Sequence, residues 1–216
     1  MSYLLYGCRR SGSLAVELAL AEIGAPHTVH DVDLEAEAQR SADYAAVNPR
    51  RKVPALVTPA GETLTESAAI LLTLDERHPE AALLPARGSA ERAQALRALL
   101  LVATEIYPLV EINDYPERFS PRPEDAPAVR ERAREHWRER WLLVEAMIRG
   151  EPFLLPGGFC VVDAYIAVVS RWAQQDAWRR RYLPRVERLT AAVAARPRCA
   201  PIWQRHRPDD TPARFS

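Results

Sequence analysis

The segment Asn48–Val57, with the sequence NPRRKVPALV, places two arginines and the chain's only lysine directly before a Val-Pro pair. The apolar run after this pair is typical of a β-strand. Proline lacks a backbone N–H group and is normally confined to sheet edges and strand starts. The segment is therefore either a plain loop that enters an edge strand, or a turn in which a cis Val53–Pro54 bond turns the backbone of Val53 sideways. In the second case the Val53 N–H and C=O groups could pair with an extended peptide, as an added strand does.

Around this segment, the N-terminal part of the chain alternates strand-like and helix-like stretches. The predicted elements are a strand over 3–8, a helix over 14–23, a strand over 27–34, a hairpin over 54–58 and 62–65, and a helix over 66–78. Gly24 is a suitable left-handed cap for the first helix, and Pro79 ends the last one. The first two strands flank a helix, so we expect them to pair in parallel through a right-handed crossover. With a further helix before the hairpin, the order βαβαββα predicts a thioredoxin-like domain.

The rest of the chain predicts helices only. They cover 90–112, with Pro108 as a candidate kink, and 128–148, 161–177, 184–195 and 199–206. Four prolines and six charged residues break any periodicity over 113–127, which predicts a loop. We therefore expect an α/β domain over residues 1–80, a linker over 81–89, and an all-helical domain over 90–216.

Composition excludes several classes of protein. Lys and Arg number 29, and so do Asp and Glu, which argues against a nucleic-acid or anionic-membrane partner. Hydrophobic residues make up 48% of the chain, enough for a folded core. The three cysteines lie far apart and share no ligand spacing with the five histidines, so we expect neither a metal site nor disulfides. No apolar run is long enough to span a membrane and no signal peptide is visible, which predicts a cytoplasmic protein.

Four segments, taken in order, resemble the cytosolic glutathione transferase family. They are NPRRKVPAL at 48–56, TLTES at 63–67, FCVVDAYIAVV at 159–169 and RYLPRVERLTAAVAARP at 181–197. The resemblance covers essentially the whole chain. It implies a thioredoxin-like glutathione-binding domain before the helical domain, a homodimer, glutathione as cosubstrate, and a small hydrophobic electrophile as the second substrate.

The resemblance also assigns glutathione contacts. Val53, before the cis Pro54, would pair with the cysteinyl backbone, and Lys52 together with Arg51 would face the glycyl carboxylate. Glu66 would hold the γ-glutamyl ammonium, and Ser67 would bind the γ-glutamyl carboxylate at the positive end of a helix. The alternatives are plain solvent exposure for the two cations, and an ordinary helix start for Glu66–Ser67.

The same resemblance places thiol activation where the first strand meets the first helix, in GCRRSGSLAV at 7–16. A free thiol has a pKa of about 8.5, so a hydroxyl hydrogen bond or a helix N-terminus must favour the thiolate. Tyr3 and Tyr6 fall within the predicted strand and are therefore not candidates for the activating hydroxyl. Ser11 is the first candidate and Ser13 the second. Cys8 is a third candidate, and its alternative is a core cysteine at the end of the strand. If no side chain activates the thiol, backbone N–H groups or Arg9 and Arg10 would hold the thiolate.

The electrophile is expected between the two halves. Its candidate contacts are Arg10, Tyr107, Tyr115, Phe119 and Trp172. Ordinary core packing is the alternative for the aromatic residues, and the loop over 113–127 is either a lid or a passive surface loop. The functional alternatives are a transferase that conjugates, isomerises or reduces its substrate, a glutathione-dependent disulfide reductase or thiol lyase, and a non-catalytic binding protein.

The segment CVVD, Cys160–Asp163, resembles the family's N-capping signature with cysteine in the place of serine or threonine. Asp163 can accept the backbone N–H of Cys160, whereas a thiol is a weak acceptor for the return bond. These two residues are therefore predicted to be structural.

Overall fold

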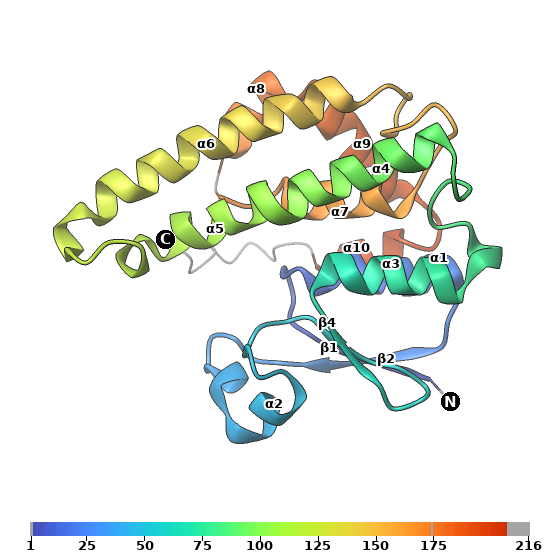
Figure 1. Cartoon of the computed structure of the whole chain (residues 1–216), viewed down its shortest axis with the longest axis horizontal. Helices are drawn as coiled ribbons and strands as arrows, with labels where there is room; N and C mark the ends of the chain where they lie inside the picture. Colours follow the sequence, from blue (N-terminus) through green and yellow to red (C-terminus); the bar gives the residue numbers. More distant parts are fainter. Residues whose placement is uncertain (1, 174, 207–216) are drawn as a thin grey trace. The chain divides into compact units, whose positions relative to one another are not determined.

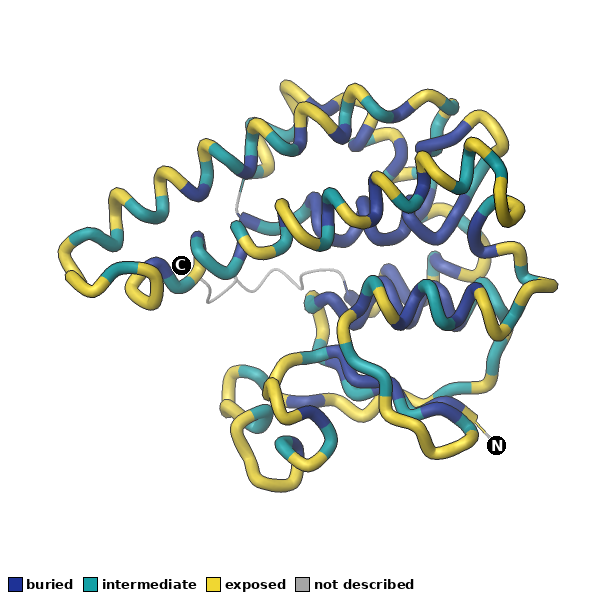
Figure 2. Tube along the Cα trace, viewed as in Figure 1, coloured by how far each residue is buried: buried dark blue, intermediate teal, exposed yellow. Residues whose placement is uncertain are grey.

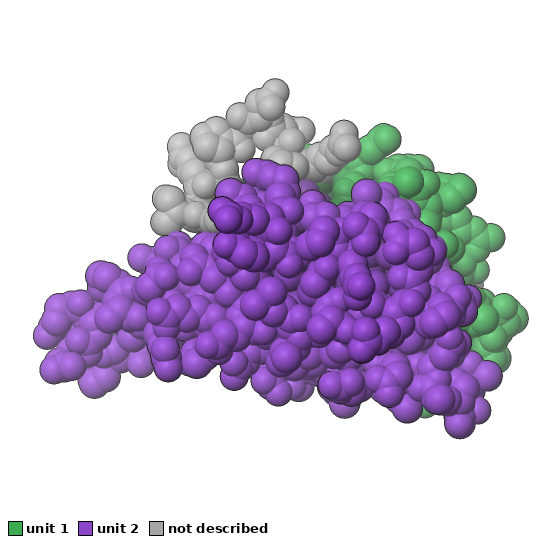
Figure 3. All heavy atoms as spheres, turned by 90° about the horizontal axis from the view of Figure 1, so that it is seen from above, with its two compact units in different colours: residues 1–83, 194–209 green, residues 84–193, 210–216 purple. Residues whose placement is uncertain are grey.

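The structure, a computed structural model, describes residues 2–173 and 175–206. Its internal contacts divide the chain into two compact units, which are coloured separately in Figure 3. Of the described residues, 2–83 and 194–206 form unit 1, and 84–173 and 175–193 form unit 2.

Unit 1 is built on a four-stranded sheet of order β2-β1-β3-β4. Its strands are β1 (Tyr3–Gly7), β2 (His27–Asp31), β3 (Ala55–Val57) and β4 (Thr63–Thr65). β1 and β2 pair in parallel, while β3 pairs antiparallel with both β1 and β4. The predicted parallel pair and the predicted hairpin are both confirmed.

Helices cover both faces of this sheet. They are α1 (Ser13–Ile23), α2 (Ala42–Val47), α3 (Ser67–Arg77) and α10 (Ala200–Arg205), with 3-10 turns η1 (Ala38–Arg40) and η2 (Pro79–Ala81). Figure 1 shows α1 and α3 side by side on one face and α2 on the other. α1 ends at Gly24, which has the left-handed φ of 75° expected of a cap. Fully buried Leu5, Leu18, Leu56 and Ile70 join the sheet to α1 and α3. This is the predicted thioredoxin-like arrangement.

Unit 2 is helical. It contains α4 (Ala90–Leu101), η3 (Val102–Ile106), α5 (Tyr107–Asp114), η4 (Pro116–Arg118), η5 (Pro123–Asp125), α6 (Ala126–Met147), α7 (Val161–Val169), α8 (Asp176–Tyr182) and α9 (Pro184–Ala195). Every residue of α7 is buried, as Figure 2 shows. The α-helix predicted over 90–112 is interrupted by the π-helical turn η3, which ends just before Pro108. Proline has no N–H group for the preceding turn, so the usual hydrogen-bond pattern cannot continue through this position.

Two boundaries differ from those that the sequence predicts. α7 ends at Val169 rather than near residue 177, because the chain turns at Ala173, whose φ is 64°. Arg179 Nη1 then donates to the Ser170 carbonyl oxygen at 3.1 Å and so satisfies the end of α7. The described residues 194–206 group with unit 1 rather than with the helices of 90–216, because α10 packs on α1.

The capping box at the start of α7 is present. Asp163 Oδ2 accepts the Cys160 N–H at 2.8 Å, and Oδ1 accepts the Leu154 N–H at 2.7 Å. Because Asp163 is fully buried, its carboxylate fixes the preceding segment onto the helix start. Burial, together with the charge of Asp163, raises the pKa of the Cys160 thiol well above its ordinary value, so this thiol stays protonated. The geometry at the start of α7 is therefore that of a capping box, and a structural role of both residues remains a prediction.

Within residues 2–173 and 175–206, no helix has the length and the apolar character that crossing a membrane requires.

Candidate functional site

The register of the sheet brings three chain segments to one edge of unit 1. Tyr6 of β1 lies opposite Ala55 of β3, and Ala55 lies opposite Thr65 of β4. β1 ends one residue beyond this row, β4 ends at it, and β3 begins at it. The turn after β1, the cationic loop before β3 and the start of α3 after β4 therefore lie at the same edge.

Two side chains fix the backbone of the cationic loop, residues 48–53, by hydrogen bonds. Tyr44 Oη and Asn48 Nδ2 donate to the Lys52 carbonyl oxygen at 2.8 and 2.6 Å. Asn48 is buried, and its Oδ1 accepts the Arg50 N–H at 3.0 Å. Burial raises the pKa of Tyr44 to about 12, so its hydroxyl remains a donor. The loop is thus fixed while Arg50, Arg51 and Lys52 are exposed.

Val53 and Pro54 follow the cationic loop, and their peptide bond is cis. Pro54 is buried and Val53 is half-buried. Within the described residues, neither peptide group of Val53 makes a hydrogen bond outside the sheet ladder. Both groups are therefore available to an extended peptide at this edge.

The start of α3 faces the cationic loop. Glu66 precedes the helix with φ 63° and ψ 104°, a backbone conformation that is costly for a residue with a side chain. Its exposed carboxylate accepts a hydrogen bond from Arg50 Nη1 at 2.8 Å. Ser67 is the first residue of α3 and is 7% exposed. The first turn of α3 holds no acidic residue, so an anion is favoured there.

The turn between β1 and α1, residues 8–13, contains a compact hydroxyl cluster. Ser11 Oγ donates to the Cys8 carbonyl oxygen at 2.8 Å, and Ser13 Oγ donates to the same oxygen at 3.1 Å. The two hydroxyl oxygens are 2.9 Å apart, and Ser13 Oγ also accepts the Cys8 N–H at 3.2 Å. Ser13 is 2% exposed and packs against Gly7, where an added Cβ would lie 2.6 Å from Ser13 Oγ. Ser13 therefore braces the turn, and Ser11 is the more accessible hydroxyl.

Cys8 is half-buried in the same turn. Burial raises the pKa of its thiol, and the charges of Asp31, Asp33 and Glu35 raise it further, against a hydrogen bond from the Leu34 backbone that lowers it. Such a thiol is poorly ionised near neutral pH and is a weak nucleophile.

Arg10 occupies the tip of the turn. Its φ is 65°, in the left-handed region, and its N–H donates to His206 Nδ1 at 3.1 Å. Beside it, Arg9 Nε donates to the Arg205 carbonyl oxygen at 2.9 Å. The C-terminal segment of unit 1 thus touches the turn directly.

Comparisons with known proteins agree with this geometry. The family described as "Glutathione S-transferase, N-terminal domain" matches residues 12–77. The chain is 30% identical to glutathione S-transferase GstA of Escherichia coli O157:H7 over 190 residues, 86% of this chain and 89% of that protein. The chain belongs to the glutathione transferase family. It is also 31% identical to the maleylacetoacetate isomerase of Pseudomonas aeruginosa, with 95% of this chain and 96% of that protein covered.

Among solved structures, a glutathione transferase homologue from Sulfitobacter with bound glutathione has a TM-score of 0.86. It is 25% identical, and the match covers 94% of this chain and 98% of that one. The family match includes Ser13, the cationic loop and Glu66–Ser67, but it begins one residue after Ser11.

The electrophile candidates of this transferase separate into groups. Arg10 belongs to unit 1, and the four aromatic residues belong to unit 2. Tyr107 and Trp172 meet edge to face, with ring centroids 4.9 Å apart. Arg118 lies over the Tyr115 ring, 3.9 Å from its centroid.

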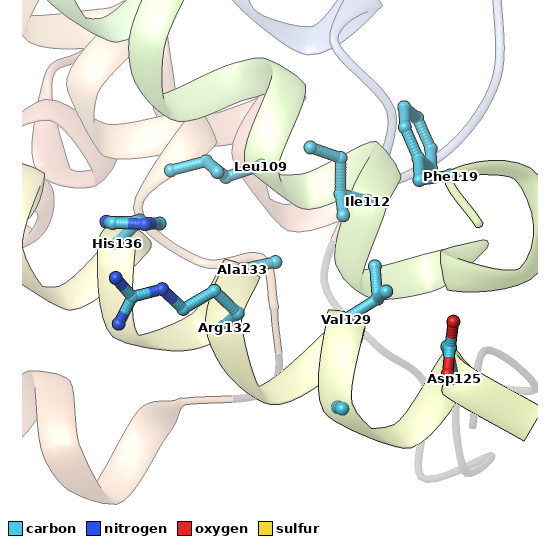
Figure 4. A pocket seen from close by; sticks show the side chains of 9 residues that line it. Leu109, Ile112, Phe119, Asp125, Val129, Arg132, Ala133 and His136 are labelled. Carbon is cyan, nitrogen blue, oxygen red and sulfur yellow. The ribbon is translucent and has the colours of Figure 1, made fainter.

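Phe119 is 48% exposed and borders a hollow of about 460 Å³ in unit 2. Figure 4 shows Leu109, Ile112 and Phe119 on one side of the hollow and the side chains of α6, among them Val129 and His136, on the other. The hollow is mostly apolar, so the structure places Phe119 at an apolar surface rather than in core packing.

Sequence reasoning missed three residues of this edge: Tyr44, Asn48 and Arg50. Asn before Pro is a turn signal, and Asn side chains commonly bond the backbone two residues on, so Asn48 was within reach of the sequence. Arg50 was indistinguishable from Arg51 before the register was known. In the described part of the chain, no group of three or more His, Cys, Asp or Glu side chains is placed to hold a metal ion.

Proposed function

We propose that this transferase binds glutathione at the edge of the sheet defined above and activates its thiol in the turn over 8–13. The observation that carries the proposal is the meeting of three recognition elements: the Val53 peptide groups, the exposed cations of the loop, and the start of α3. A zwitterionic tripeptide needs a strand partner, cations for its carboxylates and an anion for its ammonium group. All three are provided by residues that the sheet register brings to one edge.

The contacts follow from these charges. Val53 pairs with the cysteinyl backbone, next to Pro54, and Arg51 and Lys52 face the glycyl carboxylate. Glu66 receives the γ-glutamyl ammonium in competition with Arg50, whose ion pair with it is exposed and therefore weak. Ser67 and the N-terminus of α3 receive the γ-glutamyl carboxylate.

Activation requires the thiol proton to leave for solvent while the sulfur keeps its electron pair. Ser11 then turns its hydroxyl from the Cys8 carbonyl oxygen to the sulfur, and Ser13 retains that carbonyl. The N-terminus of α1, whose first turn has no acidic residue, adds partial positive charge. The thiolate forms a carbon–sulfur bond with a small apolar electrophile, whose leaving group or π-electrons take up the electron pair.

A second candidate is isomerisation, which is favoured by the 31% identity to a maleylacetoacetate isomerase over nearly the whole chain. In that case the thiolate adds transiently to an activated double bond, and elimination returns glutathione unchanged. Disulfide reduction is less well supported, since burial and three nearby carboxylates raise the pKa of Cys8. A homodimer and a cytoplasmic location remain predictions.

The test is calorimetric titration with glutathione, followed by assays with an aromatic halide and with a cis-configured unsaturated diketo acid. We expect Glu66→Gln to weaken glutathione binding, and Glu62→Gln, an exposed change at the other end of β4, to leave it unchanged. Conjugation of the halide supports the transferase, and turnover of the diketo acid alone supports the isomerase. Binding without turnover of either substrate would support a non-catalytic role, and absence of binding would overturn the proposal.

A further inference from the structure

A buried polar cluster joins the end of α10 to the turn over 8–13. His206 is 5% exposed and Glu17 of α1 is 2% exposed, and His206 Nε2 lies 3.0 Å from Glu17 Oε2. The other ring nitrogen, Nδ1, accepts the Arg10 N–H at 3.1 Å. Arg205 also pairs with Glu17. Residues almost two hundred positions apart in sequence thus share one hydrogen-bonded chain, with the Arg10 backbone at its end.

The direction of each bond in this cluster follows from its partners. A backbone N–H only donates, so His206 Nδ1 must accept, and the neutral ring carries its proton on Nε2. That proton is donated to Glu17. Burial by itself raises the pKa of Glu17, but the hydrogen bond to His206 and the charge of Arg205 outweigh it and lower the pKa. Glu17 is therefore a carboxylate that fixes the tautomer and the orientation of the imidazole.

The Arg10 backbone needs such support. A residue with a side chain at φ 65° lies in a left-handed region that is unfavourable for L-amino acids, and it stays there only where the surroundings hold it. Arg10 directly precedes Ser11, so a change at Arg10 would move the Ser11 hydroxyl. The Arg10 N–H is bonded to His206, which ties the backbone of the turn to the end of α10.

We propose that His206 is a positioning residue for thiol activation: through Glu17 and the Arg10 N–H it holds the turn that carries Ser11. This inference rests on the proposed function of that turn. It assigns to the C-terminal segment of unit 1 a part in catalysis, in addition to its packing on α1.

Two variants separate the two ring nitrogens. In His206→Gln the amide nitrogen can still donate to Glu17, but no acceptor remains where Nδ1 lies. In His206→Asn the side-chain oxygen can still accept the Arg10 N–H, while the bond to Glu17 is lost. The matched control is Arg196→Gln, which removes bonds of 2.7 and 2.8 Å to Glu22. That ion pair joins the same C-terminal segment to α1 without touching Arg10.

The measurements are kcat and KM for glutathione, and the pKa of bound glutathione from the ultraviolet absorbance of its thiolate. We expect His206→Gln to lower kcat by up to about fivefold, the loss expected for removal of the Ser11 hydroxyl itself, and to raise the thiolate pKa, with KM changed less than about twofold. We expect His206→Asn to keep kcat within about twofold of the wild type although its melting temperature falls. Arg196→Gln should also melt earlier, with kcat and thiolate pKa unchanged.

Equal kinetics in His206→Gln and Arg196→Gln would overturn the inference and leave His206 a packing residue only. Should His206→Gln not fold, a loss of kcat of about fivefold in folded His206→Asn would overturn it equally well. A wild-type protein that does not bind glutathione, or that binds it without ionising its thiol, refutes the proposed function, and the inference falls with it. If the wild type ionises glutathione but His206→Gln changes neither kcat nor the thiolate pKa, the inference is refuted and the proposed function stands.

Discussion

Replacing Ser11 by alanine tests most directly the proposal that the turn over 8–13 activates the thiol. A hydrogen bond from a hydroxyl to a charged sulfur contributes about 1.5–3 kcal/mol, and a neutral one about 0.5–1.5 kcal/mol. In the structure the Ser11 hydroxyl already donates to the Cys8 carbonyl oxygen at 2.8 Å. Activation therefore exchanges one bond for another, and the difference of the central values is about 1 kcal/mol.

That difference fixes the expected size of the effect. At 1.36 kcal/mol per pKa unit, Ser11→Ala should raise the pKa of bound glutathione by about 0.7 units. This shift lowers the ionised fraction of the bound thiol about fivefold near neutral pH, and the rate should fall by the same factor. Glutathione affinity should change little, since the peptide contacts lie at Val53 and Ser67.

The assay is the absorbance of the bound thiolate as a function of pH, with Ser13→Ala and Cys8→Ser as comparison variants. Ser13→Ala removes a buried hydroxyl that bonds both peptide groups of Cys8, so we expect a loss of folding stability of about 1–3 kcal/mol. Cys8→Ser should leave the thiolate pKa of bound glutathione unchanged.

The reasoning would be refuted by a thiolate pKa that is unshifted in Ser11→Ala while the variant binds glutathione normally. The activating groups would then be backbone N–H groups of the turn or the Arg9–Arg10 pair. Loss of disulfide turnover in Cys8→Ser would point instead to reductase chemistry through a mixed disulfide.

Three further outcomes are expected. Ser67→Ala should weaken glutathione binding by about 1.5–3 kcal/mol in calorimetry, and unchanged affinity would place the γ-glutamyl end elsewhere. Asp163→Ala should destabilise the protein by about 2–4 kcal/mol in urea unfolding, because two buried N–H groups lose their acceptor. Cys160→Ser should be neutral or stabilise the protein by up to about 1 kcal/mol. Marked destabilisation by Cys160→Ser would mean that packing of the sulfur contributes more than the helix cap. Burial tends to raise the pKa of Glu22, but its hydrogen bonds with Arg196 lower it below the ordinary 4.5. The contribution of Glu22 to stability is therefore complete above pH 4.5 and is lost as the pH falls through the folded-state pKa. Glu22→Gln should flatten the acid limb of the curve of stability against pH, and an unaltered limb would exclude Glu22 as its source.

The fold of unit 1 followed from local signals in the sequence. The apolar run before α1, the cap at Gly24 and the short separation of β3 from β4 each depend on a few adjacent residues. The edge that gathers Val53, Glu66 and Ser67 then follows from topology, because strands that pair in register end together.

Boundaries without a local signal were placed less well. The sequence after Val169, SRWAQQDA at 170–177, holds no Gly or Pro to mark the end of α7. That end depends on a left-handed turn at Ala173 and on the Arg179 side chain. The grouping of residues 194–206 with unit 1 depends likewise on ion pairs such as Arg196–Glu22, which link positions far apart in the chain. Periodicity detects that a helix is amphipathic, but it does not identify the surface on which it packs.

The turn over 8–13 shows what position in the sequence leaves out of a proposed hydrogen bond. Position alone ranks Ser11 before Ser13 as a hydroxyl near the start of α1, but it gives no hydrogen-bond partner for either. The structure separates them by burial and adds what the sequence could not supply: both donate to one carbonyl oxygen, that of Cys8. A donor that is already bonded contributes only the difference between its old and new partners. If Ser13 did not also hold that carbonyl, release of Ser11 would leave the Cys8 oxygen without a hydroxyl partner, and the gain would fall further. In the proposed mechanism Ser13 therefore bears on activation without touching the thiol, since it allows Ser11 to change partners at a cost of about one neutral hydrogen bond.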